Sequence, residues 1–246
     1  MIETSVEQSC MTLTINRPER RNALTGQMYA DLNAGLQAAQ QDASCRAVIL
    51  TGTSDYFSAG NDLSEFQAAP TVVDSPALAF LRTLASIDVP VIAAVEGHAI
   101  GVGVTLLQHC DFVYAGQSAM FTMPFVSLGL CPEGGSSLLM ARLVGARRAA
   151  EWLLLGKPFS ADEAYDSGFI TAVAPQGQAL TAARTTARAL SELPPAALRA
   201  SKRLMREGHN NDLTKTFDIE RDVFTERLQS AEAQHAFQKF FERKAK

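Results

Sequence analysis

Two glycine-containing stretches decide the fold of this chain, "FSAGNDL" (Phe57–Leu63) and "GHAIGVGVTLL" (Gly97–Leu107). Each comes after an apolar run of strand character and before a segment of helical character, so each marks a turn from strand to helix. Neither stretch carries an obvious nucleophile, base or metal ligand. Strand, glycine turn and helix follow one another through most of the chain, which predicts an α/β fold with crossover connections.

The strands expected around these turns are of two kinds. The stretch "MTLTIN", within residues 6–16, alternates apolar and polar residues, as a half-buried strand does. The run "CRAVILTG" (45–52) lacks this alternation, so we expect a strand covered on both faces. Further strands are expected at 89–97, 111–116 and 169–175, and helices at 25–41, 77–87, 101–110, 145–156, 160–168, 178–190, 195–205, 212–228 and 231–244. Residues 64–76 are expected to form a loop or a loose helix.

The helical patterns of the last part of the chain suggest a division of the sequence. Pro194 and Pro195 form the best internal boundary, because consecutive prolines interrupt a helical pattern. We therefore expect an α/β core over residues 1–193 and a separate helical region over residues 194–246.

The composition limits the classes of function. The chain has 246 residues, of which 47% are hydrophobic and 20% charged, so it can bury a sizeable core. Its formal net charge of −4 gives no reason to expect a nucleic-acid partner. No apolar run approaches the roughly 20 residues that span a bilayer, and we recognise no signal peptide, so we expect a cytoplasmic location and no membrane partner. The cysteines fit no metal-ligand spacing, and we expect free thiols and no metal site: Cys10, Cys45, Cys110 and Cys131.

The two glycine turns allow one kind of chemistry that needs no side chain. Backbone N–H groups at a helix N-terminus lack an intrahelical partner, and glycine lets a ligand approach them closely. Two such groups from two turns can stabilise negative charge on one oxygen, an arrangement worth about 3 to 4 kcal/mol per donor in other enzymes. The alternative is that the glycines serve tight packing alone. A dinucleotide site is poorly supported, because no complete G-x-G-x-x-G is present, and no P-loop motif occurs.

Five motifs extend this interpretation, and they stand in the order and spacing of a known family: "RPERRNAL", "AVILTGTSDYFSAGNDL", "VPVIAAVEGHAIGVGVTLLQHCDFVYAG", "FTMPFVSLGLCPEGGSS" and "LLLGKPFSADEAYDSGFI". Over nearly its whole length the chain resembles the crotonase family, also called the enoyl-CoA hydratase/isomerase family. The resemblance implies a crotonase (ClpP-like) spiral of ββα turns with a C-terminal helical trimerisation region, and a homotrimer or a hexamer of two trimers. It also implies an acyl-CoA substrate bound by the core, and no separate cofactor, since coenzyme A is part of the substrate.

The resemblance assigns the oxyanion donors and the coenzyme A contacts by position. The backbone N–H groups of Asn61 and Val102 would hold the thioester oxygen. The side chain of Asp62 is expected to cap the following helix rather than to react. The resemblance implies that coenzyme A contacts Ala23 and a path formed by Ser58, Ala59, Gly60, Asp62 and Leu63.

The choice of chemistry depends on which carboxylate moves protons. Members that resemble the hydratase use two glutamates, and here those positions hold Thr105 and Phe125, which cannot act as general bases near neutral pH. A glutamate occurs instead in "CPEGGSS" at Glu133, as in the peroxisomal-type Δ3,Δ2-enoyl-CoA isomerases, where it is the catalytic base. Phe125 and Leu128 would line the acyl pocket. The alternative for Glu133 is a glutamate at a helix N-terminus, stabilised by the helix dipole.

The sequence thus predicts a Δ3,Δ2-enoyl-CoA isomerase of fatty acid metabolism and β-oxidation. A hydratase, or other acyl-CoA chemistry on the same fold, remains open. A catalytically silent binding protein, of the RNA-binding kind, is also open, although the acidic charge balance argues against it.

Overall fold

Helices and strands alternate through most of the computed structural model, which describes residues 1–53, 55–68, 75–208 and 210–244. The strands are β1 (Ile2–Glu7), β2 (Cys10–Ile15), β3 (Ala47–Gly52), β4 (Tyr56–Ser58), β5 (Val91–Val95), β6 (His98–Ile100), β7 (Phe112–Gly116), β8 (Met120–Thr122), β9 (Phe159–Ser160) and β10 (Ala172–Ala174). The α-helices are α1 (Gly26–Gln41), α2 (Leu63–Ala68), α3 (Pro76–Ser86), α4 (Val102–Thr105), α5 (Ser136–Val144), α6 (Ala146–Leu154), α7 (Ala161–Asp166), α8 (Ala179–Ser191), α9 (Pro195–Glu207), α10 (Asn210–Leu228) and α11 (Ala231–Lys244). Three short 3-10 helices are η1 (Pro18–Arg20), η2 (Leu106–His109) and η3 (Val126–Leu128).

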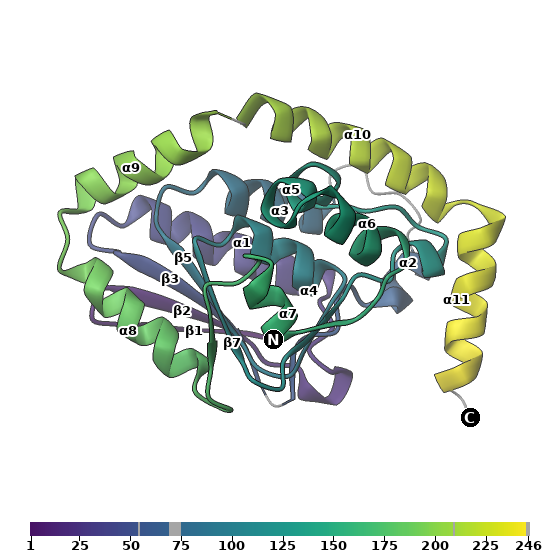
Figure 1. Cartoon of the computed structure of the whole chain (residues 1–246), viewed down its shortest axis with the longest axis horizontal. Helices are drawn as coiled ribbons and strands as arrows, with labels where there is room; N and C mark the ends of the chain where they lie inside the picture. Colours follow the sequence, from purple (N-terminus) through teal and green to yellow (C-terminus); the bar gives the residue numbers. More distant parts are fainter. Residues whose placement is uncertain (54, 69–74, 209, 245–246) are drawn as a thin grey trace.

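The strands form two sheets that the chain visits in turn (Figure 1). The larger sheet has the order β1-β2-β3-β5-β7-β10, and the smaller sheet has the order β4-β6-β8-β9. Three successive strand pairs, β3 with β4, β5 with β6, and β7 with β8, each place one strand in each sheet. This winding is the expected spiral of ββα turns. It places the ends of β4, β6 and β8 side by side, because neighbouring strands among these three are parallel.

The larger sheet is covered on both faces, as the run "CRAVILTG" predicted. In β3, Val48 and Leu50 belong to the core cluster that contains residues of α1 and α3. Ala47 and Ile49, which point to the opposite face, pack with residues of α8. Because both faces are buried, the strand shows no alternation of apolar and polar residues.

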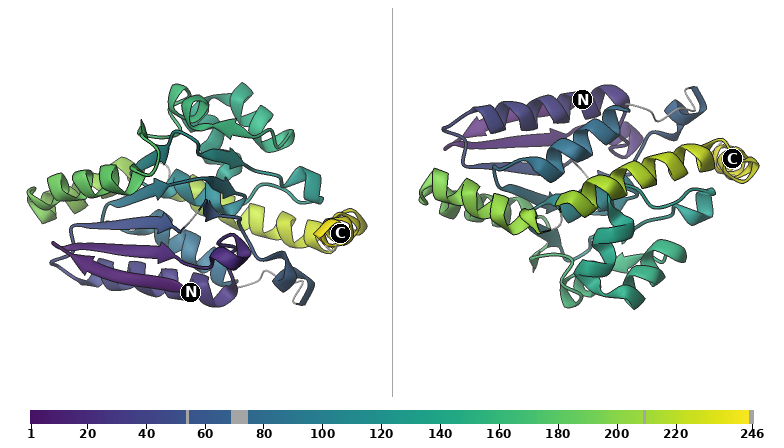
Figure 2. Two further views of the ribbon diagram at one scale, coloured as in Figure 1. Left: turned by 90° about the horizontal axis from the view of Figure 1, so that it is seen from below. Right: turned by 90° about the horizontal axis from the view of Figure 1, so that it is seen from above.

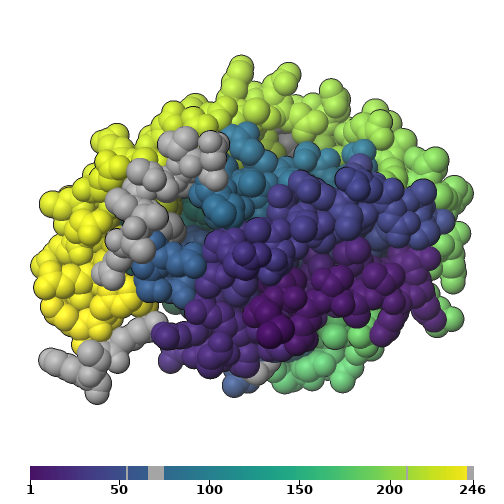
Figure 3. Space-filling model, turned by 180° about the vertical axis from the view of Figure 1, so that it is seen from behind, coloured from purple at the N-terminus to yellow at the C-terminus, as the bar shows by residue number. Residues whose placement is uncertain are grey.

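In Figure 1, α9 and α10 run over the top of the molecule and α11 turns down its right side; seen from above, these helices lie across the middle of the molecule (Figure 2). From behind, α11 (yellow) forms the left margin of the face on which the N-terminal segment (purple) lies (Figure 3). Phe217 and Phe224 of α10 and Phe237 of α11 are buried in the main core cluster. A Cβ added to Gly129, just after η3, would lie 2.6 Å from the backbone N of Ala233 in α11, so this helix closely contacts the loop after η3. No helix of the described residues is both long enough and apolar enough to cross a membrane.

Several elements differ from the sequence-based expectation. Strand β1 pairs antiparallel with β2 through a turn at Gln8 and Ser9, whose φ angles are 48° and 63°. The half-buried strand expected at "MTLTIN" is confirmed as β2, but β1 was not predicted, because neither turn residue is a glycine or asparagine that would indicate a hairpin. The helix expected at 101–110 is only α4 followed by η2. The short strands of the smaller sheet were not predicted, since two- or three-residue strands carry too little periodicity. Helix α5 was not predicted either.

The segment expected to be a loop or loose helix begins with α2, and Ser75 caps α3, whose first residue is Pro76. The rest of that expectation, at residues 69–74, lies outside the described residues.

A buried ion pair attaches α9 to the larger sheet. The Nζ atom of Lys202 lies 2.6 Å from a carboxylate oxygen of Asp111 and donates to the carbonyl of Val89 at 2.8 Å. The same carboxylate accepts the backbone N–H of Val91 at 2.7 Å. Asp111 therefore accepts a hydrogen bond at the start of β5, and its carboxylate compensates the charge of Lys202, which is only 5% exposed.

The substitution Asp111→Asn is expected to lower the free energy of unfolding by about 3 to 5 kcal/mol, because it leaves the Lys202 ammonium buried without a counter-charge. Denaturant unfolding measures this loss. The matched control is Asp222→Asn, which removes an exposed ion pair of α10 and should change stability by less than about 1 kcal/mol. An Asp111→Asn variant as stable as the control would contradict the assignment.

Candidate active site

The two glycine turns lie next to each other because the strands before them pair in parallel. Ser58 of β4 is opposite Ala99 of β6, and each strand leads directly into its turn. Gly60 has φ +85°, and a Cβ there would lie 2.7 Å from the carbonyl oxygen of Ile100. Only glycine fits this close approach of the two turns. The smaller sheet thus brings both turns to one edge, as the oxyanion interpretation requires.

Both predicted donor amides are available at this edge. Gly101 adopts φ 57° and ψ −120°, and its own N–H donates to the carbonyl of Thr122. Val102 is the first residue of α4, so its N–H has no intrahelical acceptor. Within the described residues, no hydrogen bond from the N–H of Asn61 or Val102 is found. The geometry therefore provides two adjacent N–H groups of the kind that bind a developing oxyanion.

The first turn is fixed by the loop that carries the "RPERRNAL" motif. The backbone N–H of Leu24 donates to the carbonyl of Gly60 at 2.8 Å, and the backbone N–H of Asp62 donates to the carbonyl of Leu24 at 2.9 Å. The buried side chain of Asn22 donates to the carbonyls of Thr53 and Tyr56. These bonds join the two segments that carry the predicted coenzyme A residues. Ala23 lies on one segment, and the other runs from the end of β4 to the start of α2 and holds Ser58, Ala59, Gly60, Asp62 and Leu63.

The interpretation of Asp62 as a helix cap is confirmed. Its carboxylate accepts the N–H of Ser64 at 3.1 Å, in the first turn of α2. It also forms a half-buried ion pair with Arg17 at 2.7 Å, which sequence reasoning missed. Arg17 in turn donates to the carbonyl of Ala23 at 3.0 Å, so this guanidinium joins the two loops.

Glu133 lies on the loop before α5 and reaches the helix that begins at Val102. The hydroxyl of Thr105, one turn after Val102, donates to Oε1 of Glu133 at 2.5 Å. The residue at one of the hydratase glutamate positions therefore contacts the glutamate of the isomerase-type motif. Gly134, with φ +70°, lies so close that an added Cβ would be 3.1 Å from the Thr105 hydroxyl. Glu133 is thus connected by one hydrogen bond to α4, the four-residue helix that begins with Val102.

The environment of Glu133 suits proton transfer near neutral pH. Burial raises the pKa of its carboxyl to about 7, although the hydrogen bond from Thr105 lowers it and the charge of Glu220 adds to the rise. The dipole-stabilised alternative is not supported, because the N-terminal amides of α5 bond to Glu220 instead. A carboxyl that titrates near 7 can accept a proton and return it within one turnover.

Tyr29 contacts the first turn, and nothing in the sequence singles it out. Its hydroxyl donates to Oδ1 of Asn61 at 2.5 Å from the buried face of α1. Burial raises the pKa of this phenol, and the nearby charges of Glu133 and Glu65 raise it further. Tyr29 therefore stays protonated as a donor and fixes the side chain of Asn61.

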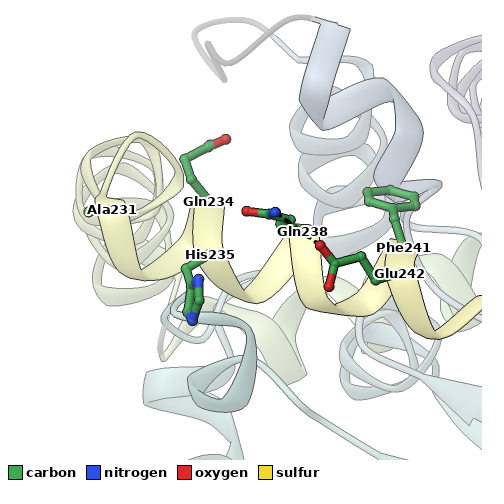
Figure 4. A pocket seen from close by; sticks show the side chains of 6 residues that line it. All are labelled: Ala231, Gln234, His235, Gln238, Phe241 and Glu242. Carbon is green, nitrogen blue, oxygen red and sulfur yellow. Dashed lines mark hydrogen bonds between the residues drawn. The ribbon is translucent and has the colours of Figure 1, made fainter.

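The predicted acyl-pocket residues adjoin η3. Phe125 is buried and Leu128 is half-buried, and both pack in the main core cluster. A surface pocket of about 600 Å³ lies along α11 (Figure 4) and is lined by Ala231, Gln234, His235, Gln238, Phe241 and Glu242. It contains none of the predicted site residues. Within the described ranges, no group of three or more His, Cys, Asp or Glu side chains could hold a metal ion.

Comparison with known proteins shows the family of the chain. The family model "Enoyl-CoA hydratase/isomerase" matches residues 5–246. The rat protein "Enoyl-CoA delta isomerase 2" is 36% identical over 95% of this chain, which spans 61% of that relative's length. The Escherichia coli "1,2-epoxyphenylacetyl-CoA isomerase" is 37% identical over 90% of this chain and 87% of its own. The structure of OdaA from Pseudomonas aeruginosa superposes with a TM-score of 0.94, at 41% identity, over 97% of this chain and 98% of that one. The chain therefore belongs to the enoyl-CoA hydratase/isomerase family.

Proposed function

We propose that this protein is a Δ3,Δ2-enoyl-CoA isomerase that acts on unsaturated fatty acyl-CoA. The observation that carries the proposal is the environment of Glu133. Its carboxyl has a pKa near 7 and accepts a hydrogen bond from Thr105 of α4, the helix that begins with the second donor, Val102. The positions that hold the two hydratase glutamates are occupied by Thr105 and Phe125. One basic group beside two N–H donors is what a double-bond shift needs.

In the proposed reaction the thioester oxygen accepts hydrogen bonds from the N–H groups of Asn61 and Val102. These donors stabilise the negative charge that forms when Glu133 removes a proton from C2. The C2–H electrons form the C1–C2 double bond of a dienolate, the C1–O π electrons move to the thioester oxygen, and the proton stays on Glu133. The same carboxyl then delivers the proton to C4, and the double bond ends between C2 and C3. The reaction is balanced without water or cofactor.

A hydratase is the less favoured function because water addition needs a second group to orient the nucleophile. The hydroxyl of Thr105 is already committed to Glu133, and Phe125 is buried. Glu220 lies near enough to influence Glu133, but both of its carboxylate oxygens accept hydrogen bonds from α5. The available groups therefore fit proton transfer better than hydration.

We also propose that the chain assembles as a homotrimer or a hexamer of two trimers. Large apolar side chains stand exposed on α9 and α10, and they include Leu204, Met205 and Ile219. Burial in a subunit contact would stabilise each by about 1.5 to 3 kcal/mol, which favours association of these helices. Sedimentation equilibrium of the purified chain measures the oligomeric state.

Glu133→Gln is expected to lower kcat for 3-enoyl-CoA by at least about 100-fold, because general acid–base catalysis contributes that much or more. The fold should persist, since glutamine removes a carboxyl whose ionisation in the buried site is costly above pH 7. Turnover and product identity are measured with 3-enoyl-CoA and 2-enoyl-CoA, and circular dichroism checks the fold. Near-normal turnover by the variant would refute the role of Glu133. Rapid formation of 3-hydroxyacyl-CoA by the unmodified protein would instead support a hydratase.

The pH dependence provides a separate prediction. Only ionised Glu133 can remove a proton, so kcat/KM should rise as the pH increases through about 7. The Thr105 hydrogen bond favours the ionised form, and Thr105→Val should therefore shift this rise to higher pH. The control is Thr185→Val, which alters an exposed threonine of α8. A Thr105→Val profile that coincides with the control, or moves to lower pH, would contradict the assignment.

A further inference from the structure

We propose that Glu220 of α10 is a positioning residue, which holds the loop of Glu133 in place and sets the electrostatic environment of its carboxyl. The inference rests on the proposed function of Glu133 as the base. Glu220 stands 87 positions after Glu133 in the chain, in the middle of a long helix. Nothing in its sequence context distinguishes it from the solvent-facing charges of the same helix.

The contacts of Glu220 are directed at the N-terminus of α5. Its Oε2 accepts the N–H of Gly135 at 2.6 Å. Its Oε1 accepts the N–H of Ser137 at 2.9 Å and the Ser137 hydroxyl at 2.6 Å. Gly135 occupies the N-cap position and has no side chain to satisfy these amides. The cap of α5 is therefore supplied by a carboxylate from α10, and both of its oxygens are used.

The capped segment is continuous with the base. Gly134 and Gly135 follow Glu133 directly, with φ angles of 70° and 78°. Two glycines in succession would leave the loop free to move if it were not held. Thr105 holds its Glu133 end, and Glu220 holds its α5 end. A shift of either end would move the Glu133 carboxylate relative to the oxyanion donors.

Helix α10 also supports this loop indirectly, through His109 of η2. The ring of Phe217, one turn before Glu220, stacks on His109 with centroids 5.7 Å apart. Nε2 of His109 lies 2.7 Å from the carbonyl oxygen of Gly134, to which it can donate when protonated at this nitrogen. Three consecutive loop residues are thus each held by a side chain: Glu133 by Thr105, Gly134 by His109, and Gly135 by Glu220.

The charge of Glu220 has an effect on Glu133 that a neutral helix cap would not have. Helix N-termini are usually capped by local serine, threonine, aspartate or asparagine side chains, which avoids burying a distant carboxylate. Glu220 is 6% exposed, and its charge disfavours ionisation of Glu133. Cys131, on the same loop, also has its pKa raised, to about 11, by burial and then by Glu220. Burial also raises the pKa of the Glu220 carboxyl, although the hydrogen bonds from Ser137 and Gly135 lower it. In its ionised form Glu220 favours the protonated form of Glu133.

The test compares Glu220→Gln and Glu220→Asp with the control Glu226→Gln, which changes an exposed glutamate of the same helix. Glutamine has one acceptor oxygen and no charge, so it loses at least one contact and the electrostatic effect. For Glu220→Gln we expect a fall in kcat of about tenfold or more with KM within about threefold, since misplacement of catalytic groups affects the chemical step. The rise of kcat/KM should also move to lower pH. Glu220→Asp keeps the charge, so its kcat should fall while the pH of the rise stays near that of the unmodified protein.

Ionisation of Glu133 is measured independently of turnover, by infrared titration of its carboxyl band with Glu133→Gln as the reference. A lower midpoint in Glu220→Gln supports the inference even if the physiological substrate differs from the one tested. An unmodified protein without isomerase turnover would overturn the proposed function alone. The inference about Glu220 is overturned if both Glu220 variants match Glu226→Gln in kcat and in the Glu133 midpoint. It is also overturned if they lose only thermal stability.

Discussion

The parallel pairing of β4 with β6 is the constraint on which the site depends. Parallel neighbours end at the same edge of a sheet, so the backbone that follows each strand turns there in close proximity. The two turns approach so closely that Gly60 has no room for a Cβ beside the carbonyl of Ile100. The N–H groups of Asn61 and Val102, for which no hydrogen bond was found in the described residues, then lie on these two adjoining turns. This explains why the most informative part of the sequence contains so few reactive side chains.

The proposed isomerisation has a second requirement, a base fixed relative to these amides. Helix α4 meets it because Val102 begins the helix and Thr105, one turn later, bonds to Glu133. The hydroxyl that replaces a hydratase glutamate thus orients the remaining carboxyl and does not move protons itself. Burial and the hydrogen bond act in opposite directions on the Glu133 pKa, and the balance lies near 7. A carboxyl in that range can give back the proton that it takes, which one-base isomerisation requires.

Sequence reasoning succeeded where the determining interactions are local. The glycine turns, the doubly covered strand at 45–52 and the Asp62 cap all depend on residues close together in the chain. It failed at the β1–β2 hairpin, where Gln8 and Ser9 adopt positive φ without a glycine or asparagine to indicate it. Tyr29 and Glu220 were missed for another reason. Each lies within a helical pattern, and its role is set by a partner that only the tertiary fold brings near.

These long-range contacts show that the helices after Pro194 and Pro195 are not separate from the core. The boundary does mark the start of α9, and the helices beyond it carry exposed apolar residues suited to subunit contacts. However, Lys202 of α9 forms a buried ion pair with Asp111 next to the start of β5, and Glu220 of α10 caps α5, the helix that follows Glu133. A surface that only mediated assembly would have no need of buried charges directed at the core, since each is costly to desolvate. The C-terminal helices therefore support the core and the loop of Glu133, in addition to any part that they have in assembly.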